Sequence, residues 1–230
     1  MDSHRTIARS AGALYIFGTV ICIIGISMTE PLRNTPDFLA QVSANERQFI
    51  AGSLCWLAMS LALAMIPVVL FPVLRPHNEI LAIGYVVFRG GLESCIGILM
   101  AGCQILLVLV SREYAVASAS DAASLQTLGT FVRDSYATLK PLLVIVFSLG
   151  AVMLYAVLYQ SKLIPRWISG WGIVAILLHL ATAFLILFRI VQPDDTSTLW
   201  MFNVQIFAQE MLMAGWLIVR GFRPSAAVPG

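Results

Sequence analysis

Six long apolar runs divide this sequence, and each is long enough to cross a bilayer as an α-helix. They cover residues 9–28, 48–74, 80–111, 139–160, 168–191 and 199–220. Crossing the hydrocarbon core takes roughly 20 apolar residues, because a helix satisfies its own backbone hydrogen bonds where water is absent. Only 11% of the residues are charged, against about 25% in an ordinary soluble domain. We therefore expect an all-α, integral membrane bundle of six transmembrane helices, forming a single polytopic domain over residues 1–230.

Two of the connections between these runs carry helical patterns of their own. Thr35, Pro36 and Asp37 predict a helix start, with Thr35 as its cap. In the longest connection, apolar side chains repeat at helical spacing with polar residues between them: Leu125, Leu128, Val132 and Tyr136. Such stripes are typical of helices at a membrane surface. We expect a short interfacial helix in each of these outer loops, serving as an anchor or as a lid over a cavity.

Basic residues in the connections indicate the orientation of the chain, because cytoplasmic loops of membrane proteins are enriched in lysine and arginine. If the N-terminus is inside, the inner segments carry seven basic and two acidic residues, and the outer segments six basic and eight acidic. The inner loops are also very short, so their positive charge is dense. We expect both termini in the cytoplasm.

A few polar side chains interrupt the apolar runs, and these are the candidate functional residues. They are Arg89, Glu93 and Gln104 in the third run, His179 in the fifth, and Asn203, Gln209 and Glu210 in the sixth. A charged group near the bilayer centre costs roughly 2.5–3.5 kcal/mol on insertion scales. Glu93, His179 and Glu210 all fall near the midpoints of their runs, which is compatible with one layer near the bilayer centre.

Arg89 lies too deep in its run for its charge to reach the surface easily. It precedes Glu93 by one helical turn, about 6 Å along the axis. It needs an anionic partner, and Glu93 and Glu210 are the candidates. One arginine and two glutamates leave a formal charge of −1, which a proton on one carboxyl or a bound cation would balance.

These residues define a candidate site. We expect Glu93 and Glu210 to be candidate acid–base residues and His179 to be a weaker one. Four further side chains are candidate ligand-binding residues: Arg89, Gln104, Asn203 and Gln209. The alternative is structural, in which the arginine and the two glutamates only fasten the third and sixth helices together.

Other classes of function find no support in the sequence. Zinc-protease, serine-hydrolase and phosphate-loop motifs are missing, and the small net charge of +2 gives no indication of nucleic-acid binding. The four cysteines lie within apolar runs without metal-binding spacing, so we interpret them as packing residues. We therefore predict no metal site, and the sequence identifies no cofactor and no oligomeric state.

Several stretches resemble a bacterial membrane family catalogued as domain of unknown function 4386. Ala8–Tyr15 is similar to the opening of that family, and Phe88–Glu93 to the Arg and Glu pattern of its third helix. Tyr159–Trp167 and the segment from Glu210 to Gly221 resemble its most recognisable turn and its last helix. The resemblance covers nearly the whole chain. It implies a multi-pass bundle in the bacterial cytoplasmic (inner) membrane and supplies no substrate.

Three hypotheses about function follow. The first is an intramembrane pocket for an amphiphilic or isoprenoid-like small molecule, with acid–base chemistry by Glu93 or Glu210. The second is a proton- or ion-coupled transporter that uses the same carboxylates. The third is a structural or accessory membrane subunit that has no ligand.

The predicted orientation can be tested with reporter fusions. Fusions after Arg75, Gln160 and Gly221 should report a cytoplasmic location, because the dense basic charge lies near these points. A fusion near Asp121 should report the opposite side. The reverse pattern of reporter activity would contradict the predicted orientation.

Overall fold

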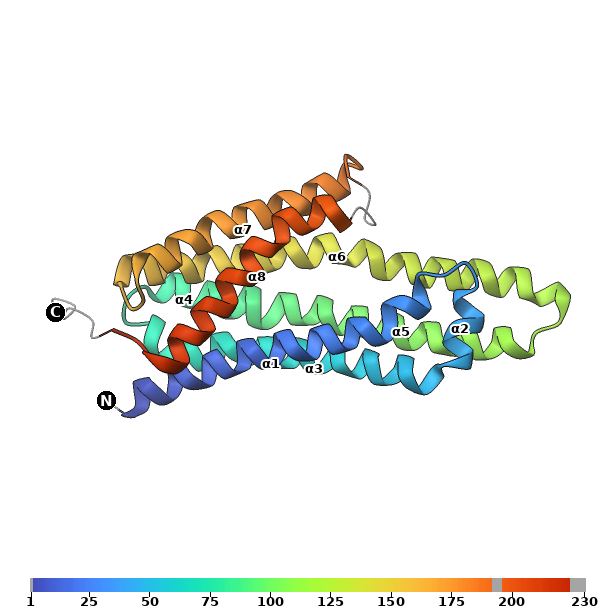
Figure 1. The fold of residues 1–230 in the computed structure, drawn as a ribbon, viewed down its shortest axis with the longest axis horizontal. Helices are drawn as coiled ribbons and strands as arrows, with labels where there is room; N and C mark the ends of the chain where they lie inside the picture. The colour runs from blue at the N-terminus through green and yellow to red at the C-terminus, as the bar shows by residue number, and fades with distance from the viewer. Residues whose placement is uncertain (1, 192–195, 224–230) are drawn as a thin grey trace. The chain divides into compact units, whose positions relative to one another are not determined.

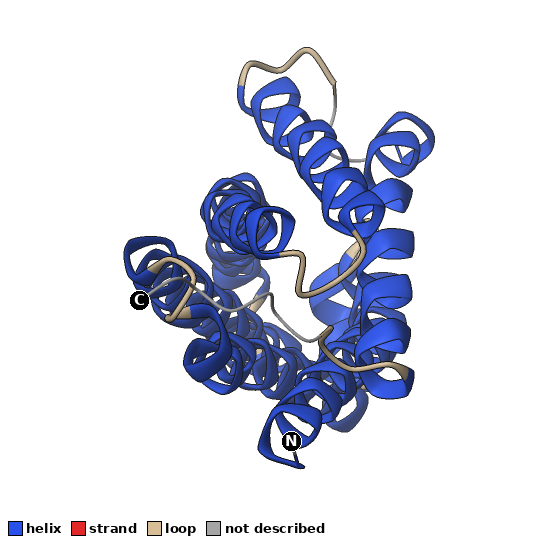
Figure 2. Cartoon of the chain, turned by 90° about the vertical axis from the view of Figure 1, so that its left-hand side faces the viewer, coloured by secondary structure: helices blue, strands red, loops and turns tan. Residues whose placement is uncertain are grey.

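A computed structural model describes residues 2–191 and 196–223, and within them all regular structure is helical (Figures 1 and 2). The all-α prediction is therefore confirmed. The helices are α1 (Asp2–Arg33), α2 (Phe38–Ala44), α3 (Glu46–Leu74), α4 (Glu79–Tyr85), α5 (Glu93–Val116), α6 (Ala119–Ser161), α7 (Arg166–Leu187) and α8 (Thr196–Val219). A π-helical segment, η1 (Val86–Leu92), joins α4 to α5 without a break.

Six helical segments of the described chain are long and apolar enough to cross a membrane, as the sequence predicted. They are Ser3–Arg33, Glu46–Leu74, Glu79–Val116, Ala119–Ser161, Arg166–Leu187 and Trp200–Val219. The longest has 43 residues, which corresponds to about 65 Å at the rise of an α-helix. A hydrocarbon core is only about 30 Å thick, so this helix must tilt or continue beyond the bilayer. Two acids of the last outer connection, Asp194 and Asp195, lie outside the described residues.

The two predicted loop helices differ from the expectation in their boundaries. The first is present as α2, which begins at Phe38 directly after Asp37. Thr35 does not cap this helix, because its hydroxyl donates to the Leu32 carbonyl. The second is the N-terminal part of α6, which continues unbroken into the transmembrane segment. No glycine or proline lies between residues 130 and 140 to end the helix there. This part of the chain therefore does not form a separate short helix.

Contacts within the chain group its residues into two units. Unit 1 contains Met1–Phe17, Leu61–Ser94 and Pro141–Gly230, and unit 2 contains Gly18–Ser60 and Cys95–Lys140. Four helices, α1, α3, α5 and α6, therefore contribute residues to both units. The expectation of a single polytopic domain stays a prediction.

Unit 1 has a large apolar core to which α1, α3, α4, α6, α7 and α8 contribute. Its most buried large side chains include Tyr15, Ile66, Leu70, Leu74, Tyr85, Leu154 and Tyr155. Within this unit α7 and α8 lie side by side (Figure 1). The tyrosines bring hydroxyl groups into the core, and such groups need partners when they are buried.

Unit 2 has a smaller core, built around the short helix α2. Phe38 and Leu39 of α2 are buried against Phe49 of α3 and Leu107 of α5. The helix is thus held by apolar side chains on one face, which accounts for the apolar stripe in so short a segment.

Close contact between α1 and α8 in unit 1 requires glycine at position 12. A Cβ atom at Gly12 would lie 2.7 Å from the Ala214 carbonyl oxygen and 2.7 Å from the Ile218 side chain. The carbonyl belongs to the backbone of α8 and cannot move aside cheaply. By contrast, a Cβ atom at Gly215 would meet nothing within 4 Å.

We predict that Gly12→Ala destabilises the protein by about 1–3 kcal/mol, since overpacking forces the helices apart. Gly215→Ala is the matched control, and it should be neutral or stabilising by up to about 1 kcal/mol because alanine favours the helix. Thermal unfolding of the two purified variants measures the difference. Equal melting temperatures would contradict the close packing of α1 on α8.

Candidate functional site

A buried ion pair within one helical turn forms the centre of the candidate site in unit 1. Arg89 Nη1 donates to both carboxylate oxygens of Glu93, each at 3.1 Å. Only 4% of the Arg89 side chain and 8% of the Glu93 side chain are exposed. Charge-assisted bonds of this kind are strong, and in an apolar surrounding they compensate for the lost hydration.

Glu210 of α8 completes the cluster more loosely. Its Oε1 lies 3.6 Å from Arg89 Nη2, within ion-pair range but beyond a short hydrogen bond. Its side chain is 16% exposed, twice the fraction of Glu93. Arg89 Nε is buried and lacks a hydrogen-bond partner among the described residues. The guanidinium is therefore well matched to Glu93 and incompletely matched to Glu210.

The backbone that carries Arg89 is unusual, because η1 is π-helical over Val86–Leu92. Segments of π-helix are rare in proteins, and those that occur are often found at functional sites. A Cβ atom at Gly150 of α6 would lie 3.1–3.3 Å from backbone and Cβ atoms of Arg89 and Phe88. Glycine at this position lets α6 approach the wide turn closely. The side chain of Arg89 is thereby held between helices and directed into the unit.

An aromatic side chain links the ion cluster to a second polar pair in unit 1. The Arg89 guanidinium carbon lies 4.2 Å from the centre of the Phe147 ring, a favourable cation–π distance. The Phe147 ring meets the His179 ring edge-on, with centres 5.5 Å apart. His179 Nδ1 is 2.7 Å from Asn203 Oδ1. An amide oxygen only accepts, so this contact requires the proton of a neutral His179 to lie on Nδ1.

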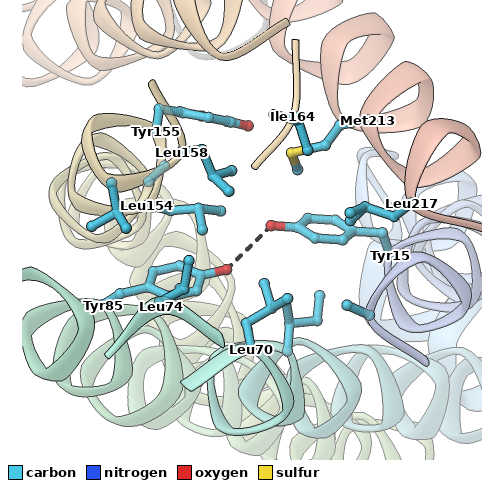
Figure 3. Close-up of a cluster of buried hydrophobic side chains, with 14 of the residues drawn as sticks. Tyr15, Leu70, Leu74, Tyr85, Leu154, Tyr155, Leu158, Ile164, Met213 and Leu217 are labelled. Carbon is cyan, nitrogen blue, oxygen red and sulfur yellow. Dashed lines mark hydrogen bonds between the residues drawn. The ribbon is translucent and has the colours of Figure 1, made fainter. Parts of the chain in front are cut away.

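Three tyrosine rings from α1, α4 and α6 point toward a common region of the core (Figure 3). The hydroxyls of Tyr15 and Tyr85 lie 3.2 Å apart, and the Tyr155 hydroxyl donates to Gln209 Oε1 at 2.6 Å. All three phenols lie close enough to Glu210 to interact with it electrostatically. Glu210 and the three tyrosine hydroxyls therefore belong to the same region of the unit 1 core.

The structure brings most of the predicted site residues into unit 1 but does not place them in one contact network. Arg89, Glu93 and Glu210 are together, as expected. Gln209 bonds Tyr155 and the Ile168 carbonyl, and so holds α8 to α7. Gln104 belongs to unit 2, and its role as a ligand-binding residue of this cluster stays a prediction without support from a contact.

The tyrosines are the part of the site that reasoning from the sequence missed. Tyr85 precedes Arg89 by four residues, a spacing that usually places two side chains on one helix face. That signal was available. Tyr15 gives no comparable signal, because a tyrosine near the end of an apolar run is as common at the membrane interface as in a core.

The chemistry open to this cluster is proton binding and the recognition of a polar group in an apolar surrounding. The cluster has one fixed cation and two carboxyls, so its formal charge depends on whether a carboxyl carries a proton. Within the described residues, no group of three histidine, cysteine, aspartate or glutamate side chains is placed to hold a metal ion.

Comparison with known proteins places the chain in a family. The family described as Domain of unknown function (DUF4386) matches residues 10–221. The chain belongs to the DUF4386 family. No curated protein and no solved structure matches it. The matched residues include most of the first span and all of the other five, and membership of the family assigns no activity to the Arg89 cluster.

Two arginine–glutamate pairs with the same four-residue spacing allow a test of how burial changes the stability cost of losing an arginine in this DUF4386 protein. Arg75 bonds Glu79 at 2.9 Å, but their side chains are 58% and 55% exposed. We predict that Arg89→Ala lowers stability by about 3–5 kcal/mol, because it leaves two buried carboxyls without a cation. Arg75→Ala should cost about 0–1 kcal/mol, as exposed pairs do.

The loss in Arg89→Ala should also depend on pH. Without the guanidinium, the folded protein binds protons on its buried carboxyls more readily than the unfolded chain, so stability falls as pH rises. Thermal unfolding of both variants at several pH values gives the comparison. If the two variants lost the same stability, the Arg89 pair would not be desolvated.

Proposed function

We propose that this chain binds an amphiphilic, isoprenoid-like small molecule inside the bilayer, with Glu210 as an exchangeable acid at its polar end. We place it in the bacterial cytoplasmic membrane with both termini in the cytoplasm. The observation that carries the proposal is that the nitrogens of the Arg89 guanidinium are unequally paired. Its Nη1 is fully occupied by Glu93, whereas Glu210 is held at 3.6 Å and Nε has no partner among the described residues.

An incomplete set of hydrogen bonds around a buried charge supports ligand binding, since buried polar groups are normally paired. A hydroxyl group fits the available valences. It could donate to Glu210 and accept from Arg89 Nε, and the nearby phenols of Tyr15, Tyr85 and Tyr155 can act either way. The apolar core of unit 1 suits the hydrocarbon part of the same molecule.

The charge of the cluster restricts the polar end of the ligand. One arginine and two glutamates give −1, or zero when Glu210 carries a proton. A phosphate or diphosphate group would add negative charge beside two carboxyls, which is unfavourable in a medium of low dielectric constant. The proposed ligand is therefore a neutral or cationic amphiphile such as a prenyl alcohol.

Proton-coupled transport is the second candidate, and the same carboxyl favours it. An acid that is only loosely paired can gain and lose a proton at modest cost, whereas Glu93 is fixed by two bonds to Arg89. Intramembrane carboxyls of this kind serve as proton relays in pumps and transporters. The two candidates differ in whether proton movement crosses the membrane.

We predict that Glu210→Gln keeps the fold and weakens binding of geranylgeraniol, a neutral prenyl alcohol, at least tenfold. The amide keeps the shape of the side chain and removes its charge and its exchangeable proton. The measurement is the rise in melting temperature of purified protein as the alcohol is titrated. Glu113→Gln, at an exposed position of α5, is the matched control and should behave like wild type.

The outcomes separate the hypotheses. Glu210→Gln protein that melts well below wild type, yet binds the alcohol normally, would show that the cluster only fastens helices together. Proton flux into liposomes that contain wild-type protein but not Glu210→Gln, without any effect of the alcohol, would favour the transporter. Equal binding of geranylgeraniol and its diphosphate would contradict the argument from charge.

A further inference from the structure

A second buried polar cluster lies in unit 2, around the ring of Tyr136. Tyr136 of α6 is 3% exposed. The Arg33 guanidinium carbon of α1 lies 4.1 Å from the centre of its ring, and Trp56 of α3 meets it edge-on, with ring centres 5.8 Å apart. Gln104 of α5 neighbours the Tyr136 hydroxyl. Tyr136 of α6 thus has one neighbouring side chain from each of three other helices, α1, α3 and α5.

The side chains of this cluster have unused hydrogen-bonding atoms. Among the described residues, Arg33 Nη1, Trp56 Nε1 and both amide atoms of Gln104 are buried without a partner. Gln104 is only 1% exposed. Buried polar groups without partners are rare in native proteins, because each loses its bonds to water. Four such atoms around one ring indicate that a bound group supplies the missing partners.

The local charges define that group. Arg33 and Lys140 both contact Glu30, with nitrogen–oxygen distances of 3.4 and 3.3 Å, so two cations share one carboxylate. The three unpaired side-chain nitrogens are hydrogen-bond donors, and the unpaired Gln104 oxygen is an acceptor. The complementary ligand carries one negative charge, several acceptor oxygens and a hydroxyl.

We propose that unit 2 binds a singly charged phosphate group that carries a neighbouring hydroxyl, at a site formed by Arg33, Trp56, Gln104 and Tyr136. The phosphate oxygens accept from Arg33 Nη1, Trp56 Nε1 and Gln104 Nε2, and the hydroxyl donates to Gln104 Oε1. Inorganic phosphate in its singly charged form and a glycerol phosphate lipid headgroup both have this chemistry. Side chains on facing helices are a usual way to build such a site in a bundle core. The site is independent of Glu210.

Gln104→Leu is the decisive variant, because the proposal and a purely structural cluster predict different outcomes for it. Removing an unpaired amide should raise the melting temperature without ligand by about 2–4 °C. The same change should weaken binding of the phosphate probe at least tenfold. Gln41→Leu, at an exposed position of α2 in the same unit, is the matched control. Lys140→Gln, on a side chain that is 44% exposed, removes one cation while keeping the fold.

The experiment measures the melting temperature of the full-length, delipidated protein in neutral detergent. The probes are inorganic phosphate, short-chain phosphatidylglycerol, phosphatidylcholine of the same chain length, and acetate. We expect saturable stabilisation of wild type, Gln41→Leu and Glu210→Gln by phosphatidylglycerol, and weaker binding by Gln104→Leu and Lys140→Gln. Stabilisation by phosphate alone would identify a free ion as the ligand, and stabilisation by the lipid alone would identify a headgroup.

Four results would overturn the proposal. One is that neither phosphate nor phosphatidylglycerol stabilises the wild-type protein. Another is an equal effect of phosphatidylcholine or acetate, which would show that the phosphate and its hydroxyl are not recognised. The third is unchanged affinity in both Gln104→Leu and Lys140→Gln. Loss of binding in Glu210→Gln would likewise contradict the independence of the two sites.

Discussion

The Arg89 guanidinium must find acceptors inside an apolar bundle, and much of unit 1 is arranged around that requirement. Glu93 accepts two bonds of 3.1 Å from the next turn, Glu210 approaches from α8, and the Phe147 ring covers a face of the cation. A guanidinium is planar and keeps its charge, so it cannot escape by losing a proton. The surrounding helices therefore have to supply the hydrogen bonds and negative charge that water would otherwise give. Glu93 supplies more of this than Glu210.

The two units show opposite electrostatic arrangements built from the same kinds of side chain. In unit 1 one cation is set against two carboxyls, whereas in unit 2 two cations share Glu30. Both clusters are framed by tyrosine, whose ring packs in an apolar core while its hydroxyl accepts or donates. The two clusters therefore favour different ligands. The excess of carboxyls in unit 1 favours neutral or cationic groups, and the excess of cations in unit 2 favours anions.

How far the sequence predicts this structure depends on the range of each interaction. The six spans follow from apolar length alone, and the Arg89–Glu93 contact follows from a four-residue step. For Glu210, the sequence predicted only that it lies at a depth in the membrane similar to that of Glu93. The π-helix, the convergence of Tyr15 and Tyr155, and the environment of Gln104 depend on packing between distant segments. Gln104 illustrates the limit, since the sequence places it in the third apolar run but does not give its neighbours.

The continuity of α6 marks a similar limit. The stripe of Leu125, Leu128, Val132 and Tyr136 indicated a helix but not where that helix would end. A local pattern gives helical periodicity, whereas the junction with the transmembrane segment depends on whether a breaker is present. Tyr136 then proved to be buried at the centre of a polar cluster.

The π-helix also bears on how this helix could have changed during evolution. A π-helical turn holds an extra residue relative to an α-helix, and it behaves as an insertion fixed within a continuous helix. Deleting one residue from Val86–Leu92 would restore an α-helical turn there and remove the wide turn that carries Arg89, while Glu93 and the later residues would face nearly the same direction as before. Elsewhere in a long membrane helix, a gain or loss at the end can be absorbed by tilt. In this segment the loss of one residue would instead be absorbed by the local turn, so its main effect would fall on Arg89 and not on the rest of the helix.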